Sequence, residues 1–261
     1  MTLHNGSRKC LIVIFILLLL SALLQGCESK RDRSKELISL GQGEFSEGER
    51  EDALKDFGQA AAADPSYDVY LEIGSFLAYN GMPKEGISYL EKATKLHSTS
   101  DAAGSMERSQ VYRLIGDVYS KLGEIPDAEK AYSTAVSIYE DNAVAYNDWG
   151  YMYADLGIKL DEALRLTKRA VNLCPKEGAY LDSLGWVYYR KHDFRSAIRY
   201  LKQAVEIEPS QGEIRYHLGT CYEAAGFRKS AIVEYSKAVY LDKSCDAARR
   251  RLVALRSSSF R

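Results

Sequence analysis

The chain has 261 residues, of which 46% are hydrophobic and 27% charged, and its formal net charge is -1. This composition is typical of a globular protein with room for one elongated or two compact domains. The near-neutral charge, without a basic stripe interleaved with aromatic residues, argues against nucleic acid as a partner. The chain has 19 Tyr against 5 Pro, which predicts recurring half-buried aromatic positions and calls for a search for repeats.

The first 26 residues predict an export signal. Arg8 and Lys9 form a short basic stretch, and residues 10–24 are almost all apolar. An apolar run of this length suits a cleaved signal peptide, which needs about 7 to 15 such residues, better than a membrane-spanning helix, which needs about 20.

The sequence LLQGC ends this apolar run and resembles the lipobox of bacterial lipoproteins. Leu24, Gly26 and Cys27 match its pattern, whereas Gln25 is less usual at its position. The resemblance implies that residues 1–26 are a signal peptide, that Cys27 is lipidated, and that residues 27–33 form a tether. More than one acyl chain would make such an anchor stable.

An uncleaved signal anchor, with Cys27 as an incidental thiol, is the alternative. Both interpretations place the remainder outside the cytoplasmic membrane. The expected location is therefore the cell membrane or outer membrane, with the chain lipid-anchored and facing the periplasm or cell exterior. Glu28 replaces the aspartate that retains many such lipoproteins in the inner membrane, which by this resemblance favours the outer membrane.

The cysteines that follow Cys27 are Cys174, Cys221 and Cys245, and no two of them have the spacing of a metal motif. A disulfide between Cys221 and Cys245 is conceivable in an oxidising compartment, but buried free thiols are favoured. We expect no metal site.

A repeat of 34 residues occupies the C-terminal half. The stretch YLDSLGWVYYRKHDFRSAIRYLKQAVEIEP (180–209) aligns with IRYHLGTCYEAAGFRKSAIVEYSKAVYLDK (214–243). Matching positions are Gly185 and Gly219, Tyr188 and Tyr222, Ala197 and Ala231, and Ala204 and Ala238. This pattern resembles the tetratricopeptide repeat (TPR), in which two antiparallel helices pack closely at small residues beside aromatic ones.

The same pattern extends back through the chain, with an insertion before the third unit. The matching positions are Trp149, Gly150, Tyr153, Gly157, Ala163, Ala170 and Pro175; Ile115, Gly116, Tyr119, Gly123, Ala128, Tyr132 and Ala135; Ile73, Gly74, Leu77, Gly81, Gly86, Leu90 and Ala93; and Leu40, Gly41, Gly48, Ala53, Phe57, Ala60 and Pro65. The third of these sets fits most loosely.

The resemblance implies an all-α fold, a right-handed superhelical solenoid of about six TPR helix-turn-helix repeats with a C-terminal capping helix. We expect the solenoid over residues 34–244, with an insertion near 98–107, and the capping helix and tail over residues 245–261. The basic run from Arg249 to Arg251 could touch an anionic lipid surface, although a solvated helix face is favoured.

In this repeat family the first helix of each hairpin lines a concave groove that binds peptides or partner helices. If the geometry of that family applies to this chain, the protein-binding groove would contain Tyr79, Arg113, Asp117, Asn147, Tyr151, Asp182, Trp186, Tyr189, Tyr216 and Glu223. Rigid aromatic rings among single charges suit peptide recognition. Trp186 is the first choice for a partner contact, and His217 is expected to be a surface histidine without partners.

The sequence contains no enzyme signature. It lacks a P-loop, a His-Glu-x-x-His helix and a Gly-x-Ser-x-Gly motif, and it has four histidines. We therefore expect no catalytic residue, no enzymatic activity and no cofactor. The carboxylate clamp of chaperone-binding repeats, which resembles Lys-x-x-x-Asn, is replaced in one repeat by Asn147 and Tyr151.

Together these features predict an exported, lipid-anchored scaffold whose groove binds an envelope protein or peptide. The layout resembles the pilotin lipoproteins of type IV pilus assembly, which act on the outer-membrane secretin. The alternatives are an adaptor for cell-wall hydrolases or envelope proteases and a self-associating structural component of the envelope. Sequence does not separate them, because solenoids change ligands by changing groove residues while the frame stays fixed.

Overall fold

The computed structural model describes residues 29–96 and 102–257, and within these ranges the chain is helical with no strand. The described helices are a segment at 29–47, α2 (Arg50–Ala63), α3 (Tyr67–Tyr79), α4 (Pro83–Leu96), α5 (Ala102–Leu122), α6 (Ile125–Ile138), α7 (Ala143–Leu156), α8 (Leu160–Leu173), α9 (Gly178–Arg190), α10 (Phe194–Ile207), α11 (Gly212–Ala224), α12 (Arg228–Leu241) and α13 (Asp246–Ser257). They form two compact units, residues 29–96 and residues 102–257.

The first unit contains two helical hairpins. The segment 29–47 packs on α2, where Ser34 donates a hydrogen bond to the Ala60 carbonyl and Phe57 is fully buried. The second hairpin pairs α3 with α4. Both hairpins occur where the repeat pattern predicted them. Residues 29–33, which the sequence assigned to a tether, are helical.

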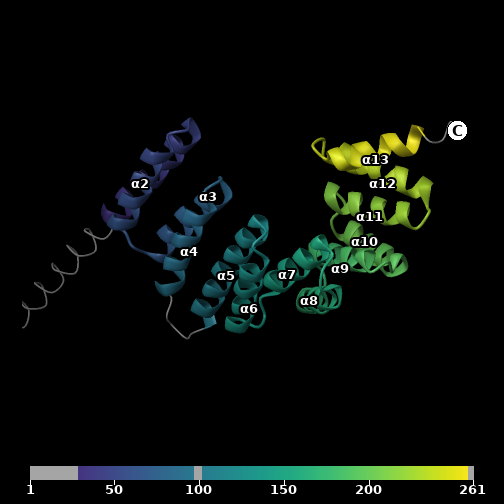
Figure 1. The fold of residues 1–261 in the computed structure, drawn as a ribbon, viewed down its shortest axis with the longest axis horizontal. Helices are drawn as coiled ribbons and strands as arrows, with labels where there is room; N and C mark the ends of the chain where they lie inside the picture. The colour runs from purple at the N-terminus through teal and green to yellow at the C-terminus, as the bar shows by residue number, and fades with distance from the viewer. Residues whose placement is uncertain (1–28, 97–101, 258–261) are drawn as a thin grey trace, which may run out of the picture. The chain divides into compact units, whose positions relative to one another are not determined.

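The second unit is a run of four hairpins, α5–α6, α7–α8, α9–α10 and α11–α12, with α13 packed against α12 at its end (Figure 1). The predicted all-α solenoid of helix-turn-helix repeats with a C-terminal capping helix is confirmed. Part of the expected insertion near 98–107 is helical, because α5 begins at Ala102 and is 21 residues long.

Small residues bring the two helices of each hairpin together, as the repeat pattern predicted. A Cβ atom on Gly185 would lie 2.7 Å from Leu201, and one on Gly219 would lie 2.8 Å from the Tyr235 ring. Both neighbours are fully buried. Any larger residue at these two glycines would push the helices apart.

The turn inside each hairpin contains at least one residue in the left-handed region. Gly157 has φ 73° after α7, and Gly226 has φ 81° after α11. In the α9–α10 turn the corresponding residue is His192, with φ 62°. This position is strained for a residue with a side chain, because L-residues avoid the left-handed region.

The stacking order creates one continuous face in the second unit. Each first helix contacts the next first helix, so α5 is followed by α7, α9 and α11. The second helices α6, α8 and α10 each contact the first helix of the following hairpin. We call the surface formed by α5, α7, α9 and α11 the first-helix face.

The three described cysteines are free thiols. Cys221 is buried, and burial raises the pKa of its thiol to about 12, which leaves it unreactive. No helix within residues 29–96 and 102–257 is long and apolar enough to cross a membrane. Cys27 and the expected signal peptide lie outside the described residues.

Candidate protein-binding face

Three pockets lie along the first-helix face, and each receives side chains from at least two repeats. The first pocket, of about 380 Å³, is lined by Asp117, Ser120, Lys121, Tyr132, Asp148, Tyr151, Met152, Asp155 and Leu156. The middle pocket, of about 320 Å³, is lined by Asn147, Asp148, Tyr151, Ala179, Asp182, Ser183, Glu208, Gln211, Glu213 and Ile214. The last pocket, of about 420 Å³, is lined by Tyr189, Tyr216, Thr220, Glu223, Ala224, Tyr235 and Arg251.

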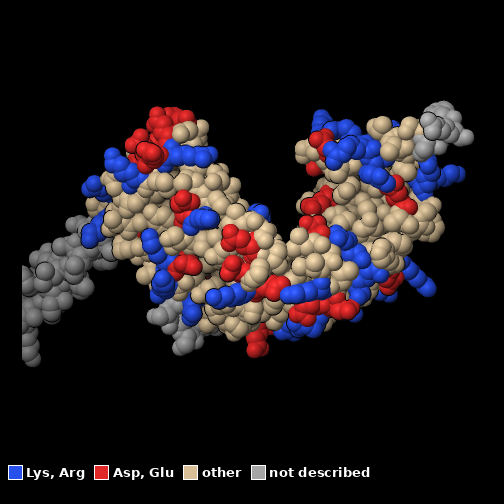
Figure 2. Space-filling model, in the orientation of Figure 1, with Lys and Arg blue, Asp and Glu red and all other residues tan. Residues whose placement is uncertain are grey.

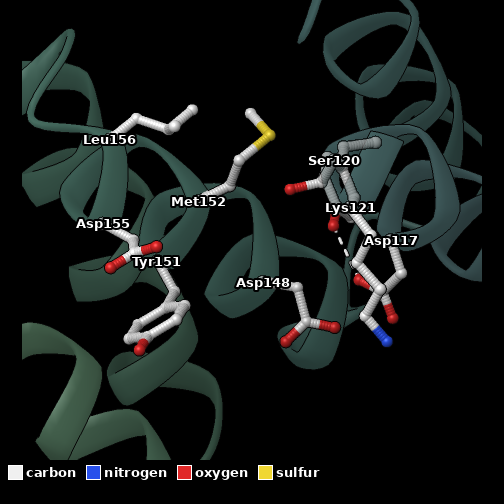
Figure 3. Close-up of a pocket in the computed structure, with 9 residues that line it drawn as sticks. Asp117, Ser120, Lys121, Asp148, Tyr151, Met152, Asp155 and Leu156 are labelled. Carbon is white, nitrogen blue, oxygen red and sulfur yellow. Dashed lines mark hydrogen bonds between the residues drawn. The ribbon is translucent and has the colours of Figure 1, made fainter. Parts of the chain in front are cut away.

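The first pocket lies between α5 and α7 (Figure 3). Asp148 of α7 lies nearest to Asp117 and Lys121 of α5, whereas Tyr151 and Asp155, also on α7, lie farther from them in this view. Because these α7 residues are spaced three or four apart, they fall on one side of the helix. The pocket is therefore walled by three carboxylates, the Lys121 side chain and the rings of Tyr132 and Tyr151.

Arg113 links the two carboxylates at the base of the first pocket. Its guanidinium donates hydrogen bonds to Asp117 and Asp148, each at 2.9 Å. Tyr132 donates a further hydrogen bond to Asp117 at 2.6 Å. Burial and the neighbouring charge of Asp117 raise the pKa of Asp148 to about 6, against the opposing effect of Arg113. The Arg113 guanidinium is therefore the shared counter-ion of Asp117 and Asp148.

The middle pocket lies where α7, α9 and α11 meet. At its edge Asp182 accepts a hydrogen bond from His217, whose Nδ1 lies 2.8 Å and 3.0 Å from the two carboxylate oxygens. Both side chains are buried. Burial alone would lower the pKa of His217, but the charge and hydrogen bond of Asp182 outweigh it and hold that pKa above its ordinary value.

The prediction that His217 is a surface histidine without partners is therefore wrong. Its exposed fraction is 4%, and its ring stacks on Trp186 with the ring centres 4.4 Å apart. The sequence could not reveal the pair, because Asp182 lies 35 residues earlier and meets His217 only when successive first helices stack.

Trp186 is enclosed by its neighbours. It stacks on Tyr189 as well as on His217, it packs against a buried cluster from α7 that includes Met152 and Tyr153, and 9% of its surface is exposed. Its ring belongs mainly to the packing between α7, α9 and α11. That Trp186 contacts a partner stays a prediction.

The last pocket lies between α9 and α11 and is closed by α12 and α13. Glu223 accepts hydrogen bonds from Tyr235 and Arg251, each at 2.9 Å. Arg251 comes from the capping helix, so α13 supplies the counter-ion of this pocket. Tyr189 and Tyr216 form its other wall.

The nine predicted groove residues of the second unit all lie on first helices. The pockets bring together Asp117 with Tyr151, Asn147 with Tyr151 and Asp182, and Tyr189 with Tyr216 and Glu223. Arg113 and Trp186 pack beside the pockets and line none of them. Tyr79 ends α3 in the first unit and is 45% exposed.

Sequence reasoning missed three acidic residues of this face, namely Asp148, Asp155 and Glu213. Asp148 follows the predicted Asn147, and Asp155 follows the predicted Tyr151 by one helical turn. The signal was the helical period itself, because a residue three or four positions from a groove residue shares its side of the helix.

Comparison with known proteins agrees with this architecture. A family model described as tetratricopeptide repeat matches residues 66–141, and a second model with the same description matches residues 178–211. The chain contains tetratricopeptide repeats. A TPR repeat-containing protein of Pseudomonas aeruginosa is 37% identical over 71 residues, which is 27% of this chain and 12% of that protein.

Solved TPR structures are similar over most of this chain. A thermophilic TPR protein of Thermus thermophilus has a TM-score of 0.60 at 22% identity and covers 73% of this chain and 98% of its own. YrrB, described as a TPR protein with an unusual peptide-binding site, has a TM-score of 0.51 at 18% identity, with coverage of 75% and 96%. At these identities the likeness establishes the fold.

Proposed function

We propose that this chain is a TPR scaffold that binds another protein along the first-helix face of its second unit. TPR scaffolds are suited to protein–protein interaction, and the observation that carries the proposal here is the row of three pockets. Adjacent pockets share residues, since Asp148 and Tyr151 line both the first and the middle one. A ligand that fills both must cross from one repeat to the next.

The walls of the pockets suit a peptide more than a compact small molecule. Tyr151, Tyr189 and Tyr216 are half-buried, so each ring is held by packing while part of it faces solvent. Rigid rings offer contact area at low cost in conformational entropy, and the carboxylates between them fix the register of a bound chain. Repeats that stack in one direction favour an extended segment.

Site-specific photo-crosslinking tests the binding face. Leu156 lines the first pocket and is 48% exposed, whereas Tyr240 lies on the second helix α12 and is 83% exposed. We would replace each by p-benzoyl-phenylalanine in the full chain, in its host. Capture of the same partner from position 156 and not from position 240 supports the proposal. Capture from position 240 alone would show that the first-helix face is not the binding face.

We also propose that the scaffold is lipid-anchored at Cys27 in the bacterial envelope. The support is the sequence LLQGC after a basic and then an apolar stretch, at a position outside the described residues. The resemblance in layout to pilotin lipoproteins makes an outer-membrane secretin of type IV pilus assembly the first partner to test. Two or more acyl chains would hold the protein at the membrane.

The intact mass of the membrane-extracted protein tests the anchor, with Cys27→Ser as the control. A chain that begins at Cys27 and is heavier by acyl groups supports the proposal. An unmodified chain that keeps residues 1–26 would show a signal anchor instead, and the lipoprotein part of the proposal would be withdrawn. The binding face is tested independently by the crosslinks above.

A further inference from the structure

The two sides of the second unit differ in charge. The first helices α5, α7, α9 and α11 carry seven Asp and Glu against five Lys and Arg, whereas the second helices α6, α8, α10 and α12 carry six against ten. Figure 2 shows acidic groups over α5 and α7 and again beside α11, and basic groups over α13. The first-helix face is thus the acidic side of the unit.

Some of these carboxylates are held by cations of the chain itself. Arg113 forms ion pairs with Asp117 and Asp148, and His217 pairs with Asp182. Asp155 and Glu213 differ, since both are exposed and neither carboxylate has an ion pair or hydrogen bond within the described residues. They are the charges available to a ligand.

Asp155 of α7 lines the first pocket, Glu213 of α11 lines the middle pocket, and Tyr151 lines both. Burial raises the pKa of Tyr151, and the charges of Glu213, Asp155 and Asp182 raise it further. The ring separates the first pocket from the middle pocket, because it lines both. A ligand cation in either pocket would sit beside an aromatic ring and at least two carboxylates, and in the first pocket it would share them with Lys121 of the chain.

Asn147 provides an observation that is independent of these charges. It lines the middle pocket, is 8% exposed, and its Nδ2 donates a hydrogen bond to Asp148 at 3.3 Å. Its Oδ1 is buried and has no hydrogen-bond donor within the described part of the chain. An unsatisfied buried acceptor is costly, so this oxygen marks a position for a donor group of a ligand.

We propose that the first and middle pockets bind two cationic side chains, Lys or Arg, of one extended peptide segment. The Tyr151 ring lies between the two cations, Asp155 and Glu213 pair with them, and Asn147 accepts a hydrogen bond from the segment. The proposal rests on the proposed function, in which the first-helix face is the binding face. It adds the charge of the partner, which is opposite to that of the carboxylate peptides recognised by clamp-type repeats.

A labelled peptide of alternating Lys and Ala, eight residues long, provides the probe. Its affinity for the full chain in mild detergent is measured by fluorescence anisotropy beside that of the Glu-Ala counterpart. We expect the Lys peptide to bind and the Glu peptide not to bind. The affinity should fall with added salt, because exposed charges are screened. Equal affinity of the unsubstituted chain for the Lys and Glu peptides would by itself overturn the proposal.

A matched pair of double variants separates the pockets from overall charge. Asp155→Asn with Glu213→Gln should weaken binding about tenfold, since two partly exposed ion pairs are lost. Asp127→Asn with Glu206→Gln makes the same change of net charge on exposed positions of α6 and α10 and should leave binding unchanged. An equal loss in both double variants would mean non-specific attraction and would overturn the proposal.

Asn147→Leu tests the second observation. Leucine has nearly the shape of asparagine. It removes the unsatisfied oxygen but also the Nδ2 that donates to Asp148, and these effects oppose each other. Thermal stability should therefore change little, while the Lys peptide binds at least fivefold more weakly. Unchanged binding would exclude Asn147 from the site. If crosslinks from position 156 capture a partner but the Lys peptide does not bind, the inference fails and the proposed function stands. If position 156 captures none, the proposed function fails first.

Discussion

Trp186→Ala should destabilise the protein, because the ring is enclosed by α7, α9 and α11. A tryptophan side chain buries about 200 Å², which at about 25 cal/mol per Å² corresponds to about 5 kcal/mol of transfer free energy. Part of this loss is offset, because the Trp186 Nε1 is buried without an acceptor in the described residues and the substitution removes that unsatisfied donor. An unmade hydrogen bond costs about 1 to 2 kcal/mol, which leaves a net loss of about 3 to 4 kcal/mol.

Urea unfolding followed by far-UV circular dichroism measures this loss. We expect the melting temperature to fall by about 10 °C as well, given the size of the unit. Tyr240→Ala is the matched control, since that ring is 83% exposed and should contribute less than about 0.5 kcal/mol. A loss below about 1 kcal/mol for Trp186→Ala would show that the ring is not part of the packing. Trp186 would then be free to contact a partner, as the sequence suggested.

Two further predictions concern pH and backbone strain. The pKa values of His217 and Asp148 are both raised in the folded state, so the fold binds extra protons. The free energy of unfolding should therefore fall as pH rises from 5 to 8. Urea titrations should show a steeper fall in the unsubstituted protein than in His217→Gln. An equal slope in the two proteins would contradict the buried pair of His217 and Asp182. His192→Gly should raise the free energy of unfolding by about 0.5 kcal/mol by relieving the left-handed φ of 62°. His192→Ala should not, and equal gains in the two variants would refute strain as the cause.

The frame of the fold was predictable because it depends on residues that recur. Gly185 and Gly219 occupy the same helix crossing one repeat apart, and each admits a large buried neighbour. Such positions are set by the close approach of two helices at their crossing. A 34-residue spacing therefore locates the hairpins, their turns and the face formed by the first helices.

The chemistry of the face was only partly predictable. The nine groove residues of the second unit were assigned to the correct helices, but their partners were not, because a pair such as Asp182 and His217 forms between repeats. The repeat period does not predict such contacts, because it aligns Asp182 with Tyr216 and His217 with Ser183, which are residues of other types. The unsatisfied Oδ1 of Asn147 is likewise a property of packing that no spacing reveals.

The arrangement of charges on the first-helix face favours rapid capture of a basic partner. Arg113 and His217 hold the inner carboxylates in place, so these groups do not repel one another when the groove is empty. Asp155 and Glu213 are exposed and keep their hydration until a partner arrives. Exposed charges act chiefly on the rate of association, whereas buried packing acts on the rate of dissociation. Added salt should therefore slow the association of a Lys peptide. Substitutions at the stacked rings of Trp186, Tyr189 and His217 should instead speed the dissociation of that peptide.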